Sequence, residues 1–497
     1  MADGSGLRTA RANKTRGATR RHLPFVVLLA CLILAPACVY FNALYNANKA
    51  FEAGRRDVEE GRLSSGLSSL ETSIEKAERI VADNPDSRWA DDALRLIIRA
   101  RLLREEWRLA AEASQTLFQY ARSARDSAEV AGWLGTAETR RGNAALADSL
   151  LTIALSEVDE RKARAELLFA RGLARKQLKR VDAALADLEE VSGLRPEWVR
   201  PRLERISLLI DDQRENETAF ALATLWELNV ADRDEAEVIK TVGYVATRSP
   251  ETALLALSNV EQANLLRASR AQLLKLRGDL HMSRGTIEKA RSDYGLVPPL
   301  AGDLRVGAEA QLAVVRLDLA QISTVEEFRP IVASLERVGR QPAGQRSSEV
   351  RRLLDMFIRM VYWIDAGDLG YMLAAETARD ELAAPRLARY LFVQYVETQP
   401  QSVWAPKAIL AVLDLDDLDF DRSAGQADND ERGSEQLRQR LYENYRSSPY
   451  VGAVLGEKPA GRFTYEELEE GLRRQLDQLE KLANDEVRAR RQASSQP

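Results

Sequence analysis

Three stretches of the sequence obey one spacing rule. In each, a glycine is followed twelve positions later by an alanine and, four positions after that, by a large apolar residue. The three sets are Gly135, Ala147 and Leu151; Gly172, Ala184 and Leu188; and Gly278, Ala290 and Tyr294. Small residues on two neighbouring helices allow their axes to approach closely. The rule therefore predicts helical hairpins, each closed by a contact between small residues.

Helical periodicity continues on both sides of these stretches. Apolar residues recur at helical spacing from residue 45 to about residue 415, and no run has the alternation typical of paired strands. Gly142 and Gly285 fall where the chain would turn between two helices, and Pro196 falls where a second helix would end. The sequence therefore predicts an all-α chain built from consecutive hairpins.

The spacing rule resembles the tetratricopeptide repeat, a helix-turn-helix unit of about 34 residues. The resemblance implies an all-α helical solenoid, here with a C-terminal helical extension. It also implies a concave groove, lined by the first helix of each repeat, that binds peptides or partner helices. The groove residues expected from this resemblance are Arg140, Lys176, Gln177, Lys275 and Met282.

One short motif occurs twice. "NPDSRWADDAL" at 84–94 returns as "QPQSVWAPKAI" at 399–409. The prolines would close one repeat, the serines would cap the next helix, and the tryptophans would lie one turn in, against the neighbouring repeat. A tryptophan ligand platform used twice is the alternative. The expected structural joints are Pro85, Ser87, Trp89, Pro400, Ser402 and Trp404.

The N-terminal segment is typical of a secretory signal. Residues 1–22 are basic, residues 23–37 are apolar and uncharged, and small residues precede Cys38. The end of this segment, "LAPAC", resembles a bacterial lipobox. That resemblance implies a lipoprotein signal peptide over 1–37 and a lipid anchor on Cys38. The alternative is an uncleaved membrane anchor over the uncharged residues 23–48.

Two segments resemble bacterial envelope tetratricopeptide-repeat lipoproteins. "NPDSRWADDA" is similar to the joint of these proteins, and "FNALYNANKAFEAG" at 41–54 is similar to their opening after the lipidated cysteine. The family includes the repeat lipoprotein of the outer-membrane β-barrel assembly machine and the Tol-associated division coordinator. The resemblance implies attachment to the periplasmic face of the outer membrane, with envelope assembly or secretion components as protein partners.

Residues capable of metal or covalent chemistry are scarce. The cysteines are Cys31 and Cys38, and the histidines are His22 and His281, so a Cys/His metal centre in the body of the chain is excluded. No phosphate-binding loop or dinucleotide fingerprint occurs, and we expect no metal, no cofactor and no enzyme activity. We interpret His281 as a packing residue. The net charge of −5 argues against nucleic acid as a partner.

The predicted organisation has six parts. They are the signal peptide, a first solenoid over 38–300, a second helical segment over 301–415, an acidic linker over 416–436, C-terminal helices over 437–490 and a disordered tail over 491–497. The last long helix has a narrow apolar row that could dock on the solenoid or on a partner helix. Its members are Leu468, Leu472, Leu476, Leu479 and Leu482. The apolar stretch 353–364 is expected to be a buried helix, with an exposed docking face as the alternative.

These observations predict a membrane-anchored, non-catalytic periplasmic scaffold for protein partners or clients in envelope assembly or secretion. A repeat subunit of a polysaccharide-export or cell-division complex is the first alternative. A solenoid-bearing peptidoglycan hydrolase is an alternative of a different class.

Overall fold

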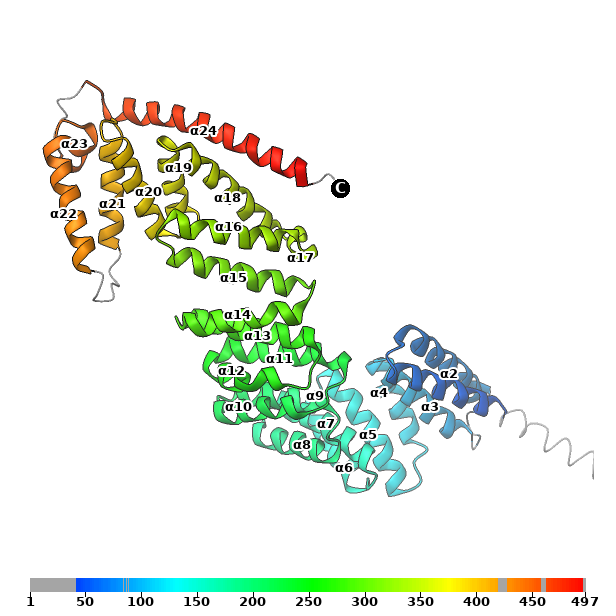
Figure 1. Ribbon diagram of the computed structural model, residues 1–497. Helices are drawn as coiled ribbons and strands as arrows, with labels where there is room; N and C mark the ends of the chain where they lie inside the picture. Colours follow the sequence, from blue (N-terminus) through cyan, green and yellow to red (C-terminus); the bar gives the residue numbers. More distant parts are fainter. Residues whose placement is uncertain are drawn as a thin grey trace, which may run out of the picture. The chain divides into compact units, whose positions relative to one another are not determined.

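The computed structural model describes residues 42–83, 85, 87, 89–418, 427–456 and 462–494, and Cys38 and the signal segment lie outside this range. Within the described residues every regular element is a helix (Figure 1). None of these helices is both long and apolar enough to cross a membrane. The chain forms two compact units, Met1–Arg214 and Glu215–Pro497, called the first and second unit below.

The first unit is a series of consecutive helices that pack on their neighbours (Figure 1). Its first described helix covers 42–59. The others are α2 (Leu63–Asp83), α3 (Ala90–Leu103), α4 (Trp107–Phe118), α5 (Ala124–Arg141), α6 (Ala144–Ser156), α7 (Arg161–Gln177), α8 (Val181–Leu194) and α9 (Val199–Asp211).

The second unit begins with shorter helices and continues as longer ones. They are α10 (Glu215–Ala223), α11 (Glu235–Arg248), α12 (Pro250–Ala256), α13 (Arg267–Ser283), α14 (Ile287–Ala301), α15 (Arg305–Gln321), α16 (Val325–Arg340), α17 (Pro342–Arg346), α18 (Ser348–Ala366), α19 (Leu369–Asp380), α20 (Pro385–Thr398), α21 (Ala405–Leu418), α22 (Ala427–Asn444), α23 (Pro449–Leu455) and α24 (Tyr465–Ser494). Three 3₁₀ segments, η1 (Thr224–Glu227), η2 (Asp232–Asp234) and η3 (Leu257–Gln262), interrupt its first part.

The glycines of the spacing rule lie at close helix contacts. A Cβ atom on Gly135 would lie 2.7 Å from Leu151 Cγ, and one on Gly278 would lie 2.6 Å from Tyr294 Cε1. Such separations are shorter than carbon atoms tolerate, so a side chain at either position would push the two helices of the hairpin apart. The all-α, tetratricopeptide-type hairpin architecture predicted from the spacing is therefore the one the chain adopts.

The turns between these helices need a left-handed backbone. Gly142 has φ +86° between α5 and α6, and Gly285 has φ +70° between α13 and α14. In the hairpin of α7 and α8 the same turn is made by Lys179, with φ +57°. Glycine adopts this conformation without steric cost, which explains why two of the three hairpins use it.

An ion pair between an arginine and a buried aspartate recurs in two hairpins at the same positions relative to the glycine. Arg171 Nη2 lies 2.7 Å from Asp187 Oδ1 in the first unit. In the second unit Arg277 Nη2 lies 2.5 Å from Asp293 Oδ1. The first pair is completed by Arg175, whose Nη1 lies 2.9 Å from Asp187 Oδ2. Each pair ties the first helix of its hairpin to the second.

His281 occupies the position that Arg175 has in the first unit. Its Nε2 lies 3.9 Å from Asp293 Oδ2, and its Nδ1 lies 2.9 Å from Thr286 Oγ1. Burial lowers the pKa of His281 below its ordinary value, and the neighbouring Asp293 only partly offsets this. Within the described residues Asp293 Oδ2 makes no hydrogen bond. His281 thus packs in its hairpin beside a carboxylate that it does not fully satisfy.

The C-terminal helix α24 packs on its own unit, against α18 and α19. Of the predicted apolar row, Leu468 and Leu472 are buried and Leu476 and Leu479 pack on the core, whereas Leu482 is 52 % exposed. The row continues instead through Ala483 and Val487, both buried, because these residues keep the four-residue spacing from Leu479. Between the two alternatives left open by the sequence, the structure has the helix docked on the solenoid.

The apolar stretch 353–364 lies in the same core. Met356, Phe357, Met360 and Trp363 of α18 are all buried, and Phe357 makes an edge-to-face contact with Phe328 at 5.0 Å. The stretch is therefore a core helix, and α24 covers the part of it that the hairpins leave open.

Three predicted boundaries do not coincide with those in the structure. The boundary between the two compact units is at 214/215, whereas the sequence predicts a division at 300/301. Helix α21 runs to Leu418 and α22 begins at Ala427, inside the segment expected to be a linker, because Asp416 is held by Arg389 at 2.6 Å. Helix α24 runs to Ser494, past the expected start of the tail, and Arg491 bonds to Asp355 of α18.

Candidate functional site

The first unit contains a groove of about 650 Å³ on one side of its hairpins. Its walls come mainly from the helix over 42–59 and from α3, α5, α7 and α9, which are the first helices of successive hairpins. Trp107 at the start of α4 and Trp198 just before α9 complete the lining. Its lining includes five aromatic side chains and, of its four arginines, three that lie over aromatic rings, and we call it the aromatic groove. They are Phe51, Trp107, Trp133, Phe169 and Trp198, with Arg99, Arg140 and Arg200.

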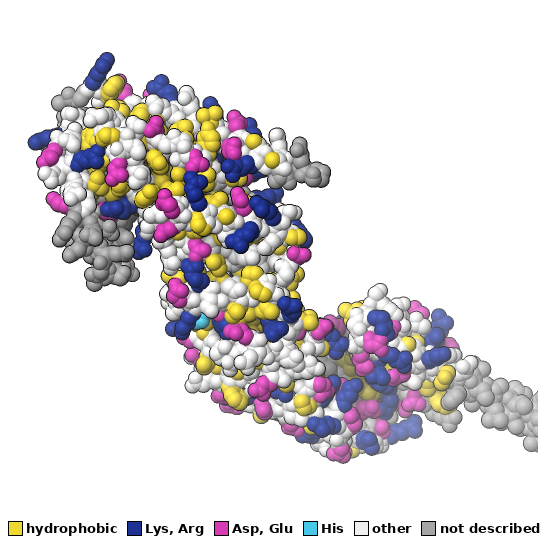
Figure 2. All heavy atoms as spheres, in the orientation of Figure 1, with side chains coloured by type: hydrophobic (Ala, Val, Ile, Leu, Met, Phe, Trp, Pro, Cys, Tyr) yellow, Lys and Arg dark blue, Asp and Glu magenta, His cyan; other side chains and the backbone are white. Residues whose placement is uncertain are grey.

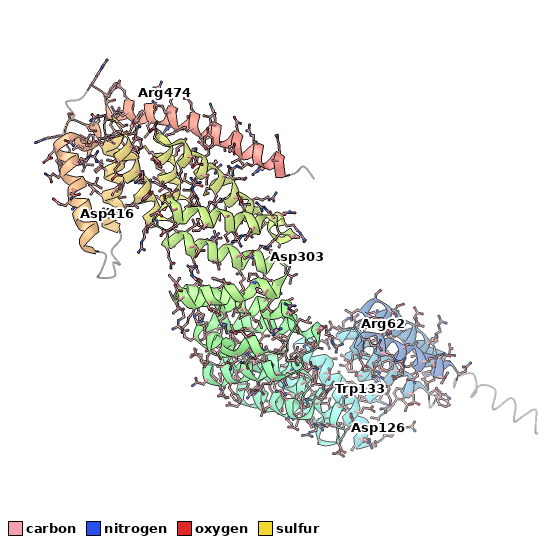
Figure 3. All side chains as sticks on the ribbon, in the orientation of Figure 1. Arg62, Asp126, Trp133, Asp303, Asp416 and Arg474 are labelled. Atoms are coloured by element: carbon pink, nitrogen blue, oxygen red, sulfur yellow. The ribbon has the colours of Figure 1, made fainter. Side chains whose placement is uncertain are left out.

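The floor of the aromatic groove is built by close helix packing. Gly132 of α5 has no side chain, and a Cβ atom there would lie 2.9 Å from Leu167 of α7. The next residue, Trp133, lines the groove from α5 (Figure 3). Phe169 of α7 contacts Trp198 edge to face, with 4.8 Å between ring centroids. These contacts hold the rings in place before any ligand is present.

Each of the three arginines lies over an aromatic ring. The guanidinium carbon of Arg99 is 4.4 Å from the Phe51 ring centre, and that of Arg140 is 5.6 Å from Trp107. Arg200 lies 5.9 Å from Phe169. All three distances are within the range of cation–π attraction. The rings therefore hold the guanidinium groups at the groove without neutralising their charge.

The carboxylates that line the aromatic groove are already engaged. Five glutamates line it, and each has a partner among the described residues. The partners are Arg55 for Glu52 and Glu59, Arg95 for Glu129, the backbone N–H groups of Lys162 and Ala163 for Glu160, and Arg195 for Glu166. On the face shown in Figure 2, acidic and basic side chains mix over this unit. The lining carboxylates are thus committed to structural ion pairs and a helix cap.

The three arginines over the rings differ from these glutamates in the part of the chain that the structure describes. Among the described residues, none of Arg99, Arg140 and Arg200 has a carboxylate oxygen within 4 Å. Partial burial lowers the pKa of Arg99 and of Arg140, and the nearby Arg200 lowers that of Arg140 further. An arginine stays charged in proteins even so. The groove therefore presents three partly desolvated cations.

A second, smaller hollow of about 340 Å³ adjoins the aromatic groove through Arg99. It is lined by Tyr45 of the 42–59 helix, by Trp89 just before α3, and by Leu96 and Arg95 of α3. Tyr45 is largely exposed. Aromatic residues thus continue along the same row of first helices toward the N-terminal end of the unit.

The groove residues expected from the sequence separate into two groups. Arg140 lines the aromatic groove. Lys176 pairs with Glu204 at 2.8 Å, and Gln177 donates to the Thr139 carbonyl at 3.0 Å, so both are held by neighbouring helices. Lys275 and Met282 belong to α13 of the second unit, where Lys275 pairs with Asp279 at 2.7 Å and Met282 is 37 % exposed.

The two copies of the joint motif share their backbone contacts. The Pro85 carbonyl accepts a hydrogen bond from the Tyr120 hydroxyl at 3.3 Å, and the Pro400 carbonyl accepts one from Tyr445 at 2.5 Å. In each copy the residues just after a later helix, α4 or α22, are thereby tied to the proline that follows an earlier one.

The serines and tryptophans of the joints differ. Ser402 Oγ accepts the Trp404 N–H at 3.2 Å and lies 2.6 Å from the Tyr395 hydroxyl, whereas the buried Ser87 hydroxyl makes no hydrogen bond within the described residues. Trp404 donates to the Leu468 carbonyl of α24 at 3.1 Å. Trp89 lines the smaller hollow instead.

Sequence reasoning missed most of the aromatic groove. Arg99, Arg200 and the aromatic rings come from different hairpins, and no single spacing joins them. One signal was available: four of the seven tryptophans lie before residue 200. In the described part of the chain, no group of three or more His, Cys, Asp or Glu residues is placed to hold a metal ion.

No protein-family model matches this sequence, and no curated protein matches it. Several solved structures match this chain, with TM-scores between 0.26 and 0.31 for three of them. One is a tetratricopeptide repeat protein from Parabacteroides merdae, with 16% identity, a TM-score of 0.27, and coverage of 63% of this chain and 99% of that one.

Two further similar structures are complexes. The structure of Naa15/Naa10 bound to HypK-THB is 12% identical with a TM-score of 0.31, and the match covers 83% of this chain and 61% of that one. The Rap protein complexed with Competence and Sporulation Factor is 13% identical with a TM-score of 0.26, and the match covers 81% of this chain and 99% of that one.

Proposed function

We propose that this protein is a non-catalytic scaffold whose first unit binds an extended segment of a partner protein in the aromatic groove. The observation that carries this proposal is the groove itself, with five aromatic rings that come from the first helices, from the start of α4 and from the residue before α9. Its volume of about 650 Å³ is that of a ligand site. Rings held in place before binding offer a large apolar area at little cost in conformational entropy.

We further propose that the scaffold is tethered to the periplasmic face of the outer membrane through a lipid on Cys38. The apolar segment before Cys38 and the resemblance of residues 41–54 to the opening of envelope repeat lipoproteins support this. The partners would then be components of envelope assembly or secretion. An inner-membrane anchor over 23–48, in a polysaccharide-export or division complex, is the second candidate.

The groove is tested by site-specific photo-cross-linking in cells. A photoreactive benzoylphenylalanine replaces Thr136, which lines the groove on α5, in the full chain. The control places it at Leu146, an exposed residue of α6 outside the groove. We expect cross-links to one defined segment of a partner from position 136 and none from position 146. Equal cross-linking from both positions, or none from 136, would contradict the proposal.

The tether is tested by membrane fractionation of the wild type beside Cys38→Ser. Loss of outer-membrane attachment in the variant supports the lipid anchor. If both proteins remain with the inner membrane, the segment 23–48 is an anchor and the second candidate replaces the first. A muramidase assay on the purified full chain addresses the hydrolase alternative. Turnover abolished by a single glutamate substitution would overturn the non-catalytic function.

A further inference from the structure

We infer that the aromatic groove selects acidic segments, in which aspartate or glutamate residues are separated by apolar or aromatic ones. Arg99, Arg140 and Arg200 would bind the carboxylates, and the rings beneath them would bind the apolar side chains. This inference rests on the proposed function and deepens it by naming the chemistry of the partner.

The charge of the lining residues supports an anionic partner. All five lining glutamates are engaged with cations or with backbone N–H groups of the protein. The three arginines over the rings lack a carboxylate within 4 Å among the described residues. The lining holds five glutamates and five cations, Arg55 and Lys162 included, so its formal charges balance. Because the glutamates are engaged and three arginines have no carboxylate nearby among the described residues, the charge left without a partner is positive, and a carboxylate complements it.

The geometry of the arginines favours carboxylate binding. A guanidinium that lies over a ring uses its face for the cation–π contact and keeps the N–H donors of its edge. A carboxylate can accept two of these N–H groups at once, in the fork geometry typical of such pairs. Because the ring already restrains the guanidinium, little side-chain entropy remains to be lost on binding.

The tryptophans indicate that the ligand has a peptide backbone. Among the described residues, the indole N–H groups of Trp107, Trp133 and Trp198 make no hydrogen bond. In the second unit, Trp404 donates to the Leu468 carbonyl at 3.1 Å and Trp363 donates to the Leu479 carbonyl at 3.4 Å. Both carbonyls belong to the docked helix α24. The chain thus uses tryptophan N–H groups elsewhere to hold the main chain of a packed segment.

A nucleic-acid strand fits the groove less well. A single strand carries a phosphate at every nucleotide and would place several of them against the five lining glutamates. The net charge of −5 would add repulsion. An acidic peptide can instead place its carboxylates at the arginines and its uncharged residues at the rings and glutamates.

The helix spacing sets the length of the segment. Packed helices lie about 8–10 Å apart, and an extended chain advances about 3.3 Å per residue. A segment that crosses the first helices would therefore meet a new helix about every three residues. A peptide of about ten residues would cover the groove.

The test measures binding of a fluorescein-labelled peptide of about ten residues, containing glutamate, leucine and phenylalanine, to the full chain in detergent by fluorescence anisotropy. A second labelled peptide has the same sequence except that glutamine replaces each glutamate. We expect the acidic peptide to bind at least about tenfold more tightly than its glutamine form. Arg140→Gln should weaken binding about tenfold, and Arg140→Lys, which keeps the charge but loses the fork, should weaken it less.

The matched control is Arg108→Gln, which removes an exposed arginine of α4 that pairs with Glu112 outside the groove. It should leave binding unchanged, and circular dichroism should show all variants folded. Equal binding of the two peptides, or equal losses from Arg108→Gln and Arg140→Gln, would overturn the inference. Tighter binding of an oligothymidylate than of the acidic peptide would overturn it as well.

Failure of this inference can be told apart from failure of the proposed function. If position 136 cross-links to a partner segment in cells but neither peptide binds, the acidic preference is wrong and the peptide-binding function stands. If neither peptide binds and position 136 also gives no specific cross-link, both are wrong.

Discussion

The two units are built from one kind of hairpin, but their surfaces differ: the first unit has a groove, and in the second a helix of the same chain covers the hairpins. In the first unit, a groove carries aromatic rings and three arginines that, within the described residues, have no carboxylate partner. In the second, α24 covers the apolar face of α18 and α19, and Leu472 and Ala483 of α24 join the core. Hairpin packing alone therefore does not decide whether a repeat surface is left open or is covered by another helix. A surface becomes available only where the chain supplies no segment of its own to cover it.

The contrast extends to individual side chains. Trp363 and Trp404 of the second unit donate to carbonyls of α24, and Lys407 lies 3.0 Å from Glu469 on that helix. In the described residues, Trp107 and Trp133 of the first unit have no such partner. Residues of one type therefore hold a docked helix in one unit and line a groove in the other.

The arginines provide the sharpest test of this contrast. Arg277 is 8 % exposed, pairs with Asp293 and Glu261, and donates to the Leu257 carbonyl. Arg277→Met should lower the free energy of unfolding by about 3–5 kcal/mol, because it leaves Asp293 buried without its cation. Arg140→Met should change it by no more than about 1 kcal/mol, since only a cation–π contact is lost.

Urea unfolding followed by circular dichroism measures both effects. Comparable losses from the two variants would show that Arg140 also has a structural role, and the distinction between the two units would then be wrong.

The docking of α24 is tested by Leu472→Ala. This residue is 2 % exposed, and its truncation should lower the free energy of unfolding by about 2–5 kcal/mol through lost burial and a cavity. Leu482→Ala on the same helix should change it by less than about 0.5 kcal/mol, because that side chain is exposed. Equal effects in thermal or urea unfolding would mean that α24 is not packed as described.

Substitutions at the glycine contact between the two helices of a hairpin should have the same effect in both units. Gly135→Ala and Gly278→Ala each place a methyl group within about 3 Å of a facing side chain and should cost about 1–3 kcal/mol. Gly295→Ala, in α14 of the Gly278 hairpin, has open space around its Cβ position and should be neutral or slightly stabilising. If urea unfolding showed very different free-energy losses for the first two variants, the two units would not share this glycine contact.

The smallest expected effect concerns pH. Because burial lowers the pKa of His281 in the folded state, the unfolded chain binds a proton more readily there. As the pH falls below about 6.5 and through the folded-state pKa of His281, this difference should lower the free energy of unfolding. At pH values well above about 6.5, His281 is neutral in both states and should make no such contribution. His281→Arg should remove this component and satisfy Asp293 Oδ2, as Arg175 satisfies Asp187. Urea unfolding at several pH values measures it, and an unchanged pH profile in the variant would contradict the assignment.

The sequence predicts the hairpins well because their signal is local. The spacing rule places a glycine against the large apolar residue sixteen positions later, and that contact appears at Gly135 with Leu151 and at Gly278 with Tyr294. The boundary at 214/215 could not be read in this way. Around it the helices are short and interrupted by 3₁₀ segments such as η1 and η3, so no regular spacing marks where one unit ends.

The candidate site was only partly predictable, because its residues meet through packing between hairpins. Arg140 could be placed on a first helix from its distance to Gly135. Arg99 and Arg200 could not be joined to it, since their proximity depends on how α3, α5 and α9 pack. The docking of α24 was left open for the same reason: Trp404 and Leu468 are 64 positions apart in the sequence.

The clustering of indole rings gives the first unit an optical property. Trp107, Trp133 and Trp198 line the aromatic groove, and Trp89 lines the hollow beside it, so four of the seven tryptophans lie along one surface. Indole emission depends on contact with water, and a segment seated on these rings would displace it. The unlabelled protein should therefore report occupancy of the groove by a blue shift of its own fluorescence, whereas Trp363 and Trp404, already against α24, would supply a constant background.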